Sequence, residues 1–363
     1  MQEILGQPQA LKSLRAALDS GRVHHAWIFS GPRGVGKFTT ALALAKILLD
    51  PDAGPNLAGE FESDPDSRTA RLIDTGTHPD LHVIHKELAL YSDNPQLRTR
   101  KLLNIPLDLL RERMLGGKTG DDRQHEATAY RTAALGHGKV FIIDEAELLD
   151  QYSQNSLLKT LEEPPAETYI FLITSRPERL FATILSRCQH VRFGPLEEDA
   201  LHEWFERANL EVGERERAWI EDYCAGSPGL ALLAAEYGFH HWWETLEPML
   251  AELECGRFPD AMGETLAKLV DDFAQRWVKN HVNASKDAAN KDGLGNLLAL
   301  LATHARRSLH ESCGGNGDAD YWLQVIDLIR HAEQQADANV NLKQLLENLA
   351  VQWTHVAPQH SGV

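Results

Sequence analysis

A glycine-rich run near the amino end contains the residue types that bind phosphate. It reads Gly31-Pro32-Arg33-Gly34-Val35-Gly36-Lys37. Glycines let consecutive backbone N–H groups turn inward around an anion, the following helix adds its positive end, and the final lysine reaches the outer phosphates. We therefore predict a nucleotide-binding loop with ATP as the candidate cofactor. Its expected binding residues are Gly31, Gly34, Val35, Gly36 and Lys37.

The residue after this lysine departs from loops that hydrolyse nucleotide. Such loops place Ser or Thr there, because the hydroxyl holds Mg²⁺, whereas this chain has Phe38. Thr39 is retained as a binding candidate, but on a helix it is rotated by about 100° from position 38 and is no clean substitute. We expect Mg²⁺ only if ATP binds, and metal-assisted hydrolysis by this chain is disfavoured.

Two carboxylates follow an apolar run about a hundred residues further along the chain. Asp144 and Glu145 come directly after residues 139–143. A carboxylate that ends a buried parallel strand lies at the edge of the sheet where ligands bind. Asp144 would face Mg²⁺ and Glu145 would polarise the attacking water, in an active or a vestigial site. An acidic helix start produces the same pattern, but its spacing from the glycine loop favours nucleotide-site ancestry.

The elements that position these residues alternate between strands and helices. Apolar runs predict strands at 27–30, 81–84, 139–143 and 169–174, and the last of these ends in Thr174, a polar group that could contact the γ-phosphate. Helices are predicted at 40–49 and 105–114, and residues 50–77 are predicted to be a long loop or an insertion. This alternation predicts a doubly wound α/β domain with a parallel sheet that ends near Phe193.

Beyond Pro195 the strand signals largely disappear, and helical periodicity takes over. We predict three domains: a P-loop core at 1–195, a small helical lid at 196–241 and an all-helical region at 242–363. The lid pattern breaks at Gly226-Ser227-Pro228-Gly229, and the last region is interrupted at 313–318.

Composition limits the classes of function. The net charge of −17 over 363 residues disfavours a protein that binds DNA by itself. The four cysteines, at 188, 224, 255 and 313, form no Cys-x-x-Cys pair, so neither zinc nor another metal site is expected. We find no signal peptide and no apolar run long enough for a bilayer, and expect a cytoplasmic protein without a membrane partner.

Three segments together resemble one protein family. The glycine loop, the run SLLKTLEEPP at 156–165 and the run ATILSRC at 182–188 are similar to the bacterial DNA polymerase III clamp-loader ATPases of the AAA+ class. Residues 338–349 are similar to the last helix of the collar in that family. The resemblance implies an AAA+ core, a helical lid and a C-terminal collar that joins subunits.

The resemblance also implies a role for Arg187. In that family the arginine of the Ser-Arg-Cys motif reaches across a subunit interface toward the neighbour's ATP, as an arginine finger acting in trans. Motor subunits also carry an arginine in the lid, where this chain has Gly229. Phe38 and Gly229 are losses on the chain's own ATP side, whereas Arg187 is retained, so the chain is most similar to the delta-prime subunits.

The family often carries a four-cysteine zinc module after the first core helix. Residues 50–77 contain no cysteine, and we interpret His78, His82 and His85 as strand and loop residues, so we expect no structural zinc. The expected partners are a motor ATPase subunit, a clamp-opening subunit and, through the complex, the sliding clamp and primed DNA. Whether the chain is an enzyme stays open.

Alternatives of other classes are open at this stage. An active motor subunit of the same loader would hydrolyse ATP despite Phe38. A separate nucleic-acid motor, such as a helicase loader, would need a basic surface that the acidic composition disfavours. A small-molecule kinase would need an acceptor pocket, which the helical C-terminal third does not suggest.

Overall fold

The computed structural model describes residues 4–55, 61–100, 102–281, 284–313, 319–337 and 341–357. The chain divides into two compact units. One contains residues 1–210 and 224–230, and the other contains residues 211–223 and 231–363. These two units are defined by compactness, and they do not test the boundaries of the three predicted domains, which stay a prediction.

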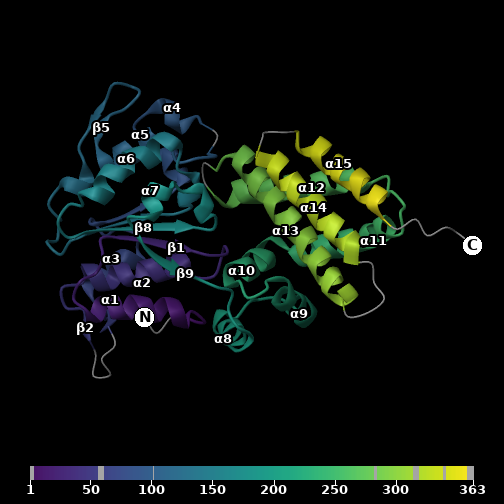
Figure 1. The fold of residues 1–363 in the computed structure, drawn as a ribbon, viewed down its shortest axis with the longest axis horizontal. Coiled ribbons are helices and arrows are strands. Elements are labelled where there is room, and N and C mark those ends of the chain that lie inside the picture. The colour runs from purple at the N-terminus through teal and green to yellow at the C-terminus, as the bar shows by residue number, and fades with distance from the viewer. Residues whose placement is uncertain are drawn as a thin grey trace, which may run out of the picture. The chain divides into compact units, whose positions relative to one another are not determined.

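The first unit is built on a five-stranded parallel sheet, with the strand order β4-β7-β8-β1-β9 (Figure 1). The strands are β1 (Ala26–Ser30), β4 (Leu81–Ile84), β7 (Lys139–Ile143), β8 (Thr168–Thr174) and β9 (Gln189–Arg192). Every residue of β1 and of β7 is buried. Strands of a parallel sheet that is covered on both faces are apolar along their whole length, because both faces are buried. The parallel sheet and its buried strands confirm the predicted fold class.

Helices cover both faces of this sheet (Figure 1). Side chains of α1 (Pro8–Asp19) and α2 (Lys37–Leu49) share one apolar cluster with alternate residues of β1, including Trp27 and Phe29. On the other face lie α5 (Leu107–Leu110), α6 (Gln151–Glu162) and α7 (Ala182–Leu185). The unit also contains α8 (Glu198–Ala208) and the 3-10 turns Ala146–Leu148 and Pro177–Arg179.

Two predicted segments of this unit differ in detail from the structure. Residues 50–77, predicted to be a long loop or an insertion, contain β2 (Gly54–Pro55), β3 (Phe61–Glu62) and α3 (Arg68–Asp74), so they are not a single loop. The Ser67 side chain caps α3 by accepting a hydrogen bond from the backbone N–H of Ala70 at 3.1 Å, a local signal that the polar composition masked.

The helix predicted at 105–114 is shorter than expected. It begins at Leu107 and changes at Arg111 into a π turn (Arg111–Leu115). The surrounding segment contains the 3-10 turns Lys86–Tyr91 and Thr128–Tyr130, the helix α4 (Pro95–Arg98) and the hairpin strands β5 (Gly117–Lys118) and β6 (Gln124–His125).

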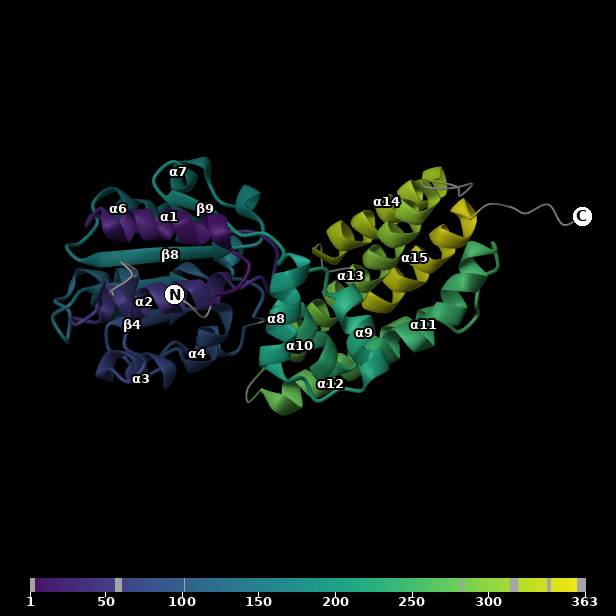
Figure 2. The ribbon, with the colours of Figure 1, turned by 90° about the horizontal axis from the view of Figure 1, so that it is seen from below.

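All the secondary-structure elements described in the second unit are helices (Figure 2). Its helices include α9 (Glu214–Tyr223), α11 (Phe239–Glu254), α12 (Met262–Asn280), α13 (Lys286–Cys313), α14 (Ala319–Asp337) and α15 (Leu342–Val356), and α10 (Pro228–Tyr237) has its last seven residues there. The apolar faces of these helices bury large aromatic side chains, including Trp242, Phe273 and Trp353. The indole N–H of Trp353 donates to the hydroxyl of Tyr321 at 2.7 Å.

The predicted collar match at 338–349 falls mostly on α15, while residues 338–340 lie outside the described part. Residues 314–318, which belong to the interruption predicted at 313–318, also lie outside the described part. Among the described residues, no helix combines the length and apolar character needed to cross a bilayer.

Candidate nucleotide site and arginine donor

The glycine loop lies where the sequence predicts it, between β1 and α2 at the carboxyl edge of the sheet. Gly31 contacts the backbone so closely that a side-chain carbon there would lie 2.2 Å from the carbonyl oxygen of Phe193. Gly36 directly precedes α2, and Val35 is buried at 2% exposure. The strand, turn and helix that a phosphate-binding loop needs are therefore present.

The lysine of the loop is bound within the loop itself. The Lys37 ammonium donates to the carbonyl oxygen of Gly31 at 2.7 Å and also to that of Pro32. Burial lowers the pKa of Lys37 to about 8, although Glu147 and Asp144 oppose this shift. A phosphate would therefore compete with two backbone carbonyls for the ammonium group.

The residues at the start of α2 offer a poor donor set for Mg²⁺. Phe38 is partly buried and packs against the apolar cluster of the sheet. Thr39 is exposed, and the Thr40 hydroxyl donates to the carbonyl oxygen of Gly36 at 2.8 Å. A phenyl ring cannot coordinate a hard cation, and Mg²⁺ requires oxygen ligands in near-octahedral geometry. Position 38 therefore supplies no oxygen ligand for the magnesium that nucleotide hydrolysis requires.

The segment 226–229 sits directly on the glycine loop. The Ser227 hydroxyl donates to the carbonyl oxygen of Arg33 at 2.9 Å, and the N–H of Gly229 donates to that of Gly34 at 2.8 Å. A side-chain carbon at Gly229 would lie 2.6 Å from the Cα of Gly34. Glycine at position 229 therefore permits a backbone-to-backbone contact that a residue with a side chain would prevent.

The acidic pair ends β7 beside the loop, as expected. The Asp144 carboxylate accepts from the N–H of Glu145 at 3.0 Å, and burial, followed by the nearby Glu147 charge, raises the pKa of Asp144. Glu145 has a left-handed backbone, with φ of 51°. Its carboxylate forms ion pairs with Arg33 at 3.2 Å and with Lys86 at 3.1 Å.

These ion pairs matter because a general base must be able to accept a proton. Arg33 pairs with Oε1 of Glu145 and Lys86 with Oε2, so each oxygen of this carboxylate faces a cation. In this arrangement Glu145 fastens the glycine loop to the segment after β4, instead of facing the loop as an unpaired carboxylate.

A third carboxylate, Glu147, was not given a role from the sequence. It accepts from the hydroxyl of Ser175 at 2.7 Å and from its N–H at 3.2 Å. Burial acts to raise the pKa of Glu147, but the polar groups of Ser175 and Thr174 outweigh it and hold the pKa below its usual value. Its proximity to Lys37 makes it a member of the site. The only sequence signal was its place two residues after Glu145.

Thr174 also belongs to this edge of the sheet. It is 1% exposed, and its hydroxyl accepts from the N–H of Arg176 at 3.0 Å. Its carbonyl oxygen accepts from the N–H of Gly31 at 3.3 Å. The fold therefore brings together the loop, Asp144, Glu145 and Thr174, whereas Thr39 points away from the protein interior and Arg187 lies elsewhere.

Arg187 lies at the amino edge of the sheet. It precedes β9 by two residues, and the first residue of β9, Gln189, pairs with Trp27 early in β1. The last residue, Arg192, pairs with Ser30, after which the glycine loop begins. The β1 strand between these pairs is about 10 Å long. Arg187 and the chain's own glycine loop are thus on opposite edges.

The Arg187 side chain is held by three neighbours. Its Nη2 atom forms an ion pair with Oε1 of Glu162 at 2.6 Å. Its Nη1 atom donates to the carbonyl oxygen of Thr183 at 3.0 Å and to the hydroxyl of Ser186 at 3.4 Å. The side chain remains 36% exposed, so other groups can still reach it.

The three histidines considered as metal ligands each have a different contact. His78 is buried, His82 stacks on Phe141 with ring centres 4.7 Å apart, and His85 pairs with Glu87 at 2.8 Å. No group of three or more His, Cys, Asp or Glu side chains that could hold a metal ion occurs among the described residues.

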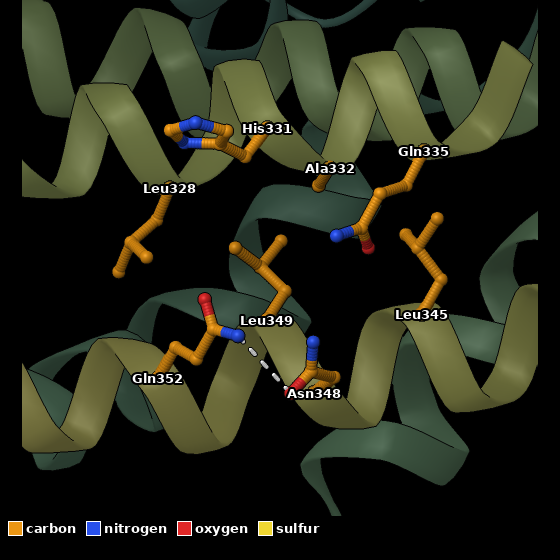
Figure 3. A pocket seen from close by; sticks show the side chains of 8 residues that line it. All are labelled: Leu328, His331, Ala332, Gln335, Leu345, Asn348, Leu349 and Gln352. Atoms are coloured by element: carbon orange, nitrogen blue, oxygen red, sulfur yellow. Dashed lines mark hydrogen bonds between the residues drawn. The ribbon is translucent and has the colours of Figure 1, made fainter.

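A small pocket occurs in the helical unit between α14 and α15 (Figure 3). Its lining residues are Leu328, His331, Ala332, Gln335, Leu345, Asn348, Leu349 and Gln352. The free volume of about 10 Å³ accommodates roughly one water molecule. This pocket is too small for a nucleotide.

Comparison with known proteins gives one family. Residues 6–197, more than half of the 363-residue chain, match the family described as "DNA polymerase III, delta subunit". The chain is 34% identical over 197 residues to DNA polymerase III subunit delta' of Bacillus subtilis, which covers 54% of this chain and 50% of that protein. It is also 34% identical over 312 residues to subunit tau of Escherichia coli, covering 85% of this chain and 40% of tau.

Among solved structures, the chain is similar to a DNA polymerase III gamma subunit-related protein of Thermotoga maritima. The two are 17% identical, with a TM-score of 0.42, and the match covers 96% of this chain and 99% of the other. The chain spans about half, or less, of the length of the two curated relatives named above.

Proposed function

We propose that this chain, which belongs to the DNA polymerase III delta-prime subunit family of clamp-loader proteins, completes the ATP site of a neighbouring subunit and does not hydrolyse ATP itself. In this proposal Arg187 stabilises the charge that develops on the neighbour's transferring phosphoryl group. Family membership is the starting point, and the geometry of the chain's own residues supports the division of roles.

The observation that carries the proposal is the separation of Arg187 from the chain's own loop. They lie at opposite edges of one parallel sheet, connected by the registered strands β1 and β9. An arginine at the amino edge is out of reach of a phosphate bound at the carboxyl edge of the same sheet. Partial exposure leaves Arg187 accessible to a second subunit. This placement agrees with a role of Arg187 at the ATP site of a neighbouring subunit and does not agree with a role at the chain's own loop.

The chain's own site supports the second half of the proposal. Phe38 removes the magnesium hydroxyl, Lys37 is bound to loop carbonyls, and Glu145 is held by Arg33 and Lys86. Gly229 in place of an arginine removes one more group that could bind the γ-phosphate. These four features affect different requirements of hydrolysis: magnesium binding, phosphate binding and activation of water. A substitution that restores one of them therefore leaves the other defects in place.

The partners follow from the same proposal. A motor ATPase subunit would provide the nucleotide that Arg187 contacts, and a clamp-opening subunit would be a second neighbour. The sliding clamp and primed DNA would be reached through the complex, since the net charge of −17 opposes DNA binding by this chain alone.

The test uses the loader reconstituted from this chain and the other loader subunits of its own organism. Arg187→Ala is expected to leave assembly intact and to lower ATP turnover at each affected site on the order of 10³-fold. The loss for the whole ring will be smaller, because other sites use other arginines. Arg207→Ala is the control, since Arg207 pairs with Glu203 on the surface of α8. Equal turnover in the two variants would remove Arg187 from the mechanism.

A second candidate function is an active motor like the gamma and tau subunits. It is favoured by the long match to tau, which covers 85% of this chain. It requires Mg²⁺-dependent ATP hydrolysis by the purified chain that disappears in Lys37→Ala. Absence of turnover at saturating ATP and Mg²⁺ would exclude it.

A further inference from the structure

We propose that Glu162 is a positioning residue for Arg187, which it holds on the amino edge of the sheet in an orientation ready for the neighbour's phosphate. This inference rests on the proposed function of Arg187. It adds a residue to that function, because Glu162 belongs to no nucleotide-binding segment and touches the reacting atoms only through the arginine.

The contacts around Arg187 leave part of the guanidinium available. Nη2 of Arg187 forms the ion pair with Glu162, while Nη1 donates hydrogen bonds to the Thr183 carbonyl and the Ser186 hydroxyl. Within the described part of the chain, Nε has no hydrogen-bond partner. The planar fork of five N–H groups is therefore fixed on one side and can still donate to an anion on the other.

Glu162 can hold the arginine because its own position is well defined. It is the last residue of α6, and the preceding residue, Leu161, accepts a hydrogen bond at its carbonyl oxygen from His25 at 3.0 Å. His25 directly precedes β1, so this bond ties the end of α6 to the amino edge of the sheet. Thr183, on the short helix α7, provides the second fixed support.

The placement of Glu162 is unfavourable for the helix that carries it. A carboxylate in the last turn of a helix lies near the negative end of the helix dipole, where a cation would stabilise and an anion does not. Helix stability therefore does not explain this residue, whereas the contact with Arg187 does. An exposed ion pair contributes little to folding, so we assign the pair to orientation of the arginine and not to stability.

Orientation of this kind affects the rate of reaction more than the affinity. A long arginine that is free in solution samples many rotamers, and most of them place the guanidinium away from the phosphoryl group. Fixing it beforehand increases the fraction of complexes in a reactive geometry. Because the finger acts in the transition state, loss of orientation lowers kcat and leaves the KM for ATP unchanged.

The experiment uses the reconstituted loader with five versions of this chain: wild type, Glu162→Ala, Glu162→Gln, Arg187→Ala and the double variant Glu162→Ala/Arg187→Ala. Glu162→Ala is expected to lower kcat on the order of tenfold per affected site, with KM unchanged. Glu162→Gln retains an acceptor oxygen for Nη2 and should keep most of the rate. The double variant should lose no more than Arg187→Ala, because both substitutions remove one function.

Glu163→Ala is the matched control. Glu163 is exposed, adjoins Glu162 at the end of α6, and lacks an ion-pair partner in the described chain. Its removal changes the charge near the helix end by the same amount, so a purely structural or dipole effect would appear in both variants. The unfolding temperatures of the two variants are expected to be alike, with turnover lowered only in Glu162→Ala.

The outcomes separate this inference from the function on which it rests. A loss in Arg187→Ala with no loss in Glu162→Ala would overturn the positioning role and leave the arginine donor in place. Turnover above wild type in Glu162→Ala, or further loss in the double variant, would also overturn it. No loss in Arg187→Ala would overturn both.

Discussion

The N–H of Gly229 donates a hydrogen bond of 2.8 Å to the carbonyl oxygen of Gly34, which joins the start of α10 to the glycine loop by backbone alone. The two Cα atoms are so close that neither position has room for a side chain. The loop is therefore held by a contact that depends on two glycines.

Gly229→Ala should destabilise the protein. The new carbon would lie 2.6 Å from the Cα of Gly34, a backbone atom that cannot move as a side chain can. We expect the free energy of unfolding to fall by about 1–3 kcal/mol, as for other overpacked sites, measured by urea denaturation.

Gly295→Ala is the control for this substitution. Gly295 lies within α13 and has nothing within 4 Å of the added carbon. Alanine there should leave stability unchanged or raise it by up to about 1 kcal/mol through helix propensity. Equal effects of the two substitutions would show that the Gly34 contact is unimportant.

Phe38→Thr should not by itself produce an ATPase. It provides the missing hydroxyl, but Lys37 remains bound to two carbonyls and Glu145 remains in its two ion pairs. The substitution also removes an aromatic ring from the apolar cluster, so a lower unfolding temperature is expected. Colorimetric phosphate release with Mg²⁺ and ATP measures the activity. Turnover that appears in Phe38→Thr and disappears in Phe38→Thr/Lys37→Ala would identify Phe38 as the sole defect.

The contribution of Lys37 to the free energy of unfolding should increase as the pH rises above about 8. Its pKa is lowered to about 8 in the folded state, below the 10.5 of an ordinary lysine, so the unfolded chain binds more protons between these values. The contribution of Lys37 to the free energy of unfolding then rises with pH between about 8 and 10.5, with a limiting slope of about 1.4 kcal/mol per pH unit.

Comparison with Lys37→Met isolates this contribution. The stability of wild type relative to the variant should increase from pH 8 to pH 10, as the buried ammonium loses its proton in the folded state. Urea unfolding at each pH measures the difference. A difference that stays constant over this range would mean that Lys37 is not deprotonated in the folded protein.

Ser175→Ala should destabilise the protein in a pH-dependent way. The Ser175 hydroxyl donates at 2.7 Å to Glu147, whose pKa is held below its usual value. A lowered carboxyl pKa contributes stability above the unfolded pKa and loses it as the pH falls through the folded pKa. We expect a loss of about 1–3 kcal/mol at neutral pH, shrinking in acid as Glu147 protonates.

Ser156→Ala on α6 provides the comparison, since Ser156 forms no hydrogen bond through its side chain within the described residues. Its effect should stay within about 0.5 kcal/mol at all pH values. A Ser175→Ala effect that is independent of pH would separate Ser175 from the titration of Glu147.

The sequence was sufficient for four of the five strands and for the positions of the glycine loop, Asp144 and Thr174, but it did not predict β9, whose residues are mostly exposed and form no continuous apolar run. Continuous apolar runs such as 139–143 are a direct consequence of burial on both faces, and the residue after each run marks the carboxyl edge. The positions of Asp144 and Thr174 beside the glycine loop follow from that rule. The helix α3 was missed because its cap, Ser67, lies in a stretch of turn-forming residues.

The remaining features depend on contacts between segments distant in the chain. The hydrogen bond between Ser227 and Arg33 joins residues 194 positions apart, and no local pattern encodes it. The pairing of Glu145 with Lys86 and of Glu162 with Arg187 likewise depends on how neighbouring strands and helices align. Spacing identified Asp144 and Glu145 but not Glu162, and only the fold shows which cations these carboxylates face.

The two edges of the sheet give the molecule a polarity. An association that brings the Arg187 edge of one subunit to the glycine-loop edge of the next is heterologous, so it has a direction and propagates head to tail. Under the proposed function this chain offers its arginine in one direction only, while Lys37 and residues 226–229 donate hydrogen bonds to the carbonyl oxygens of its own loop. Under the proposed function, such a subunit would stand at one end of a series of active interfaces and would make an otherwise repeating ring asymmetric.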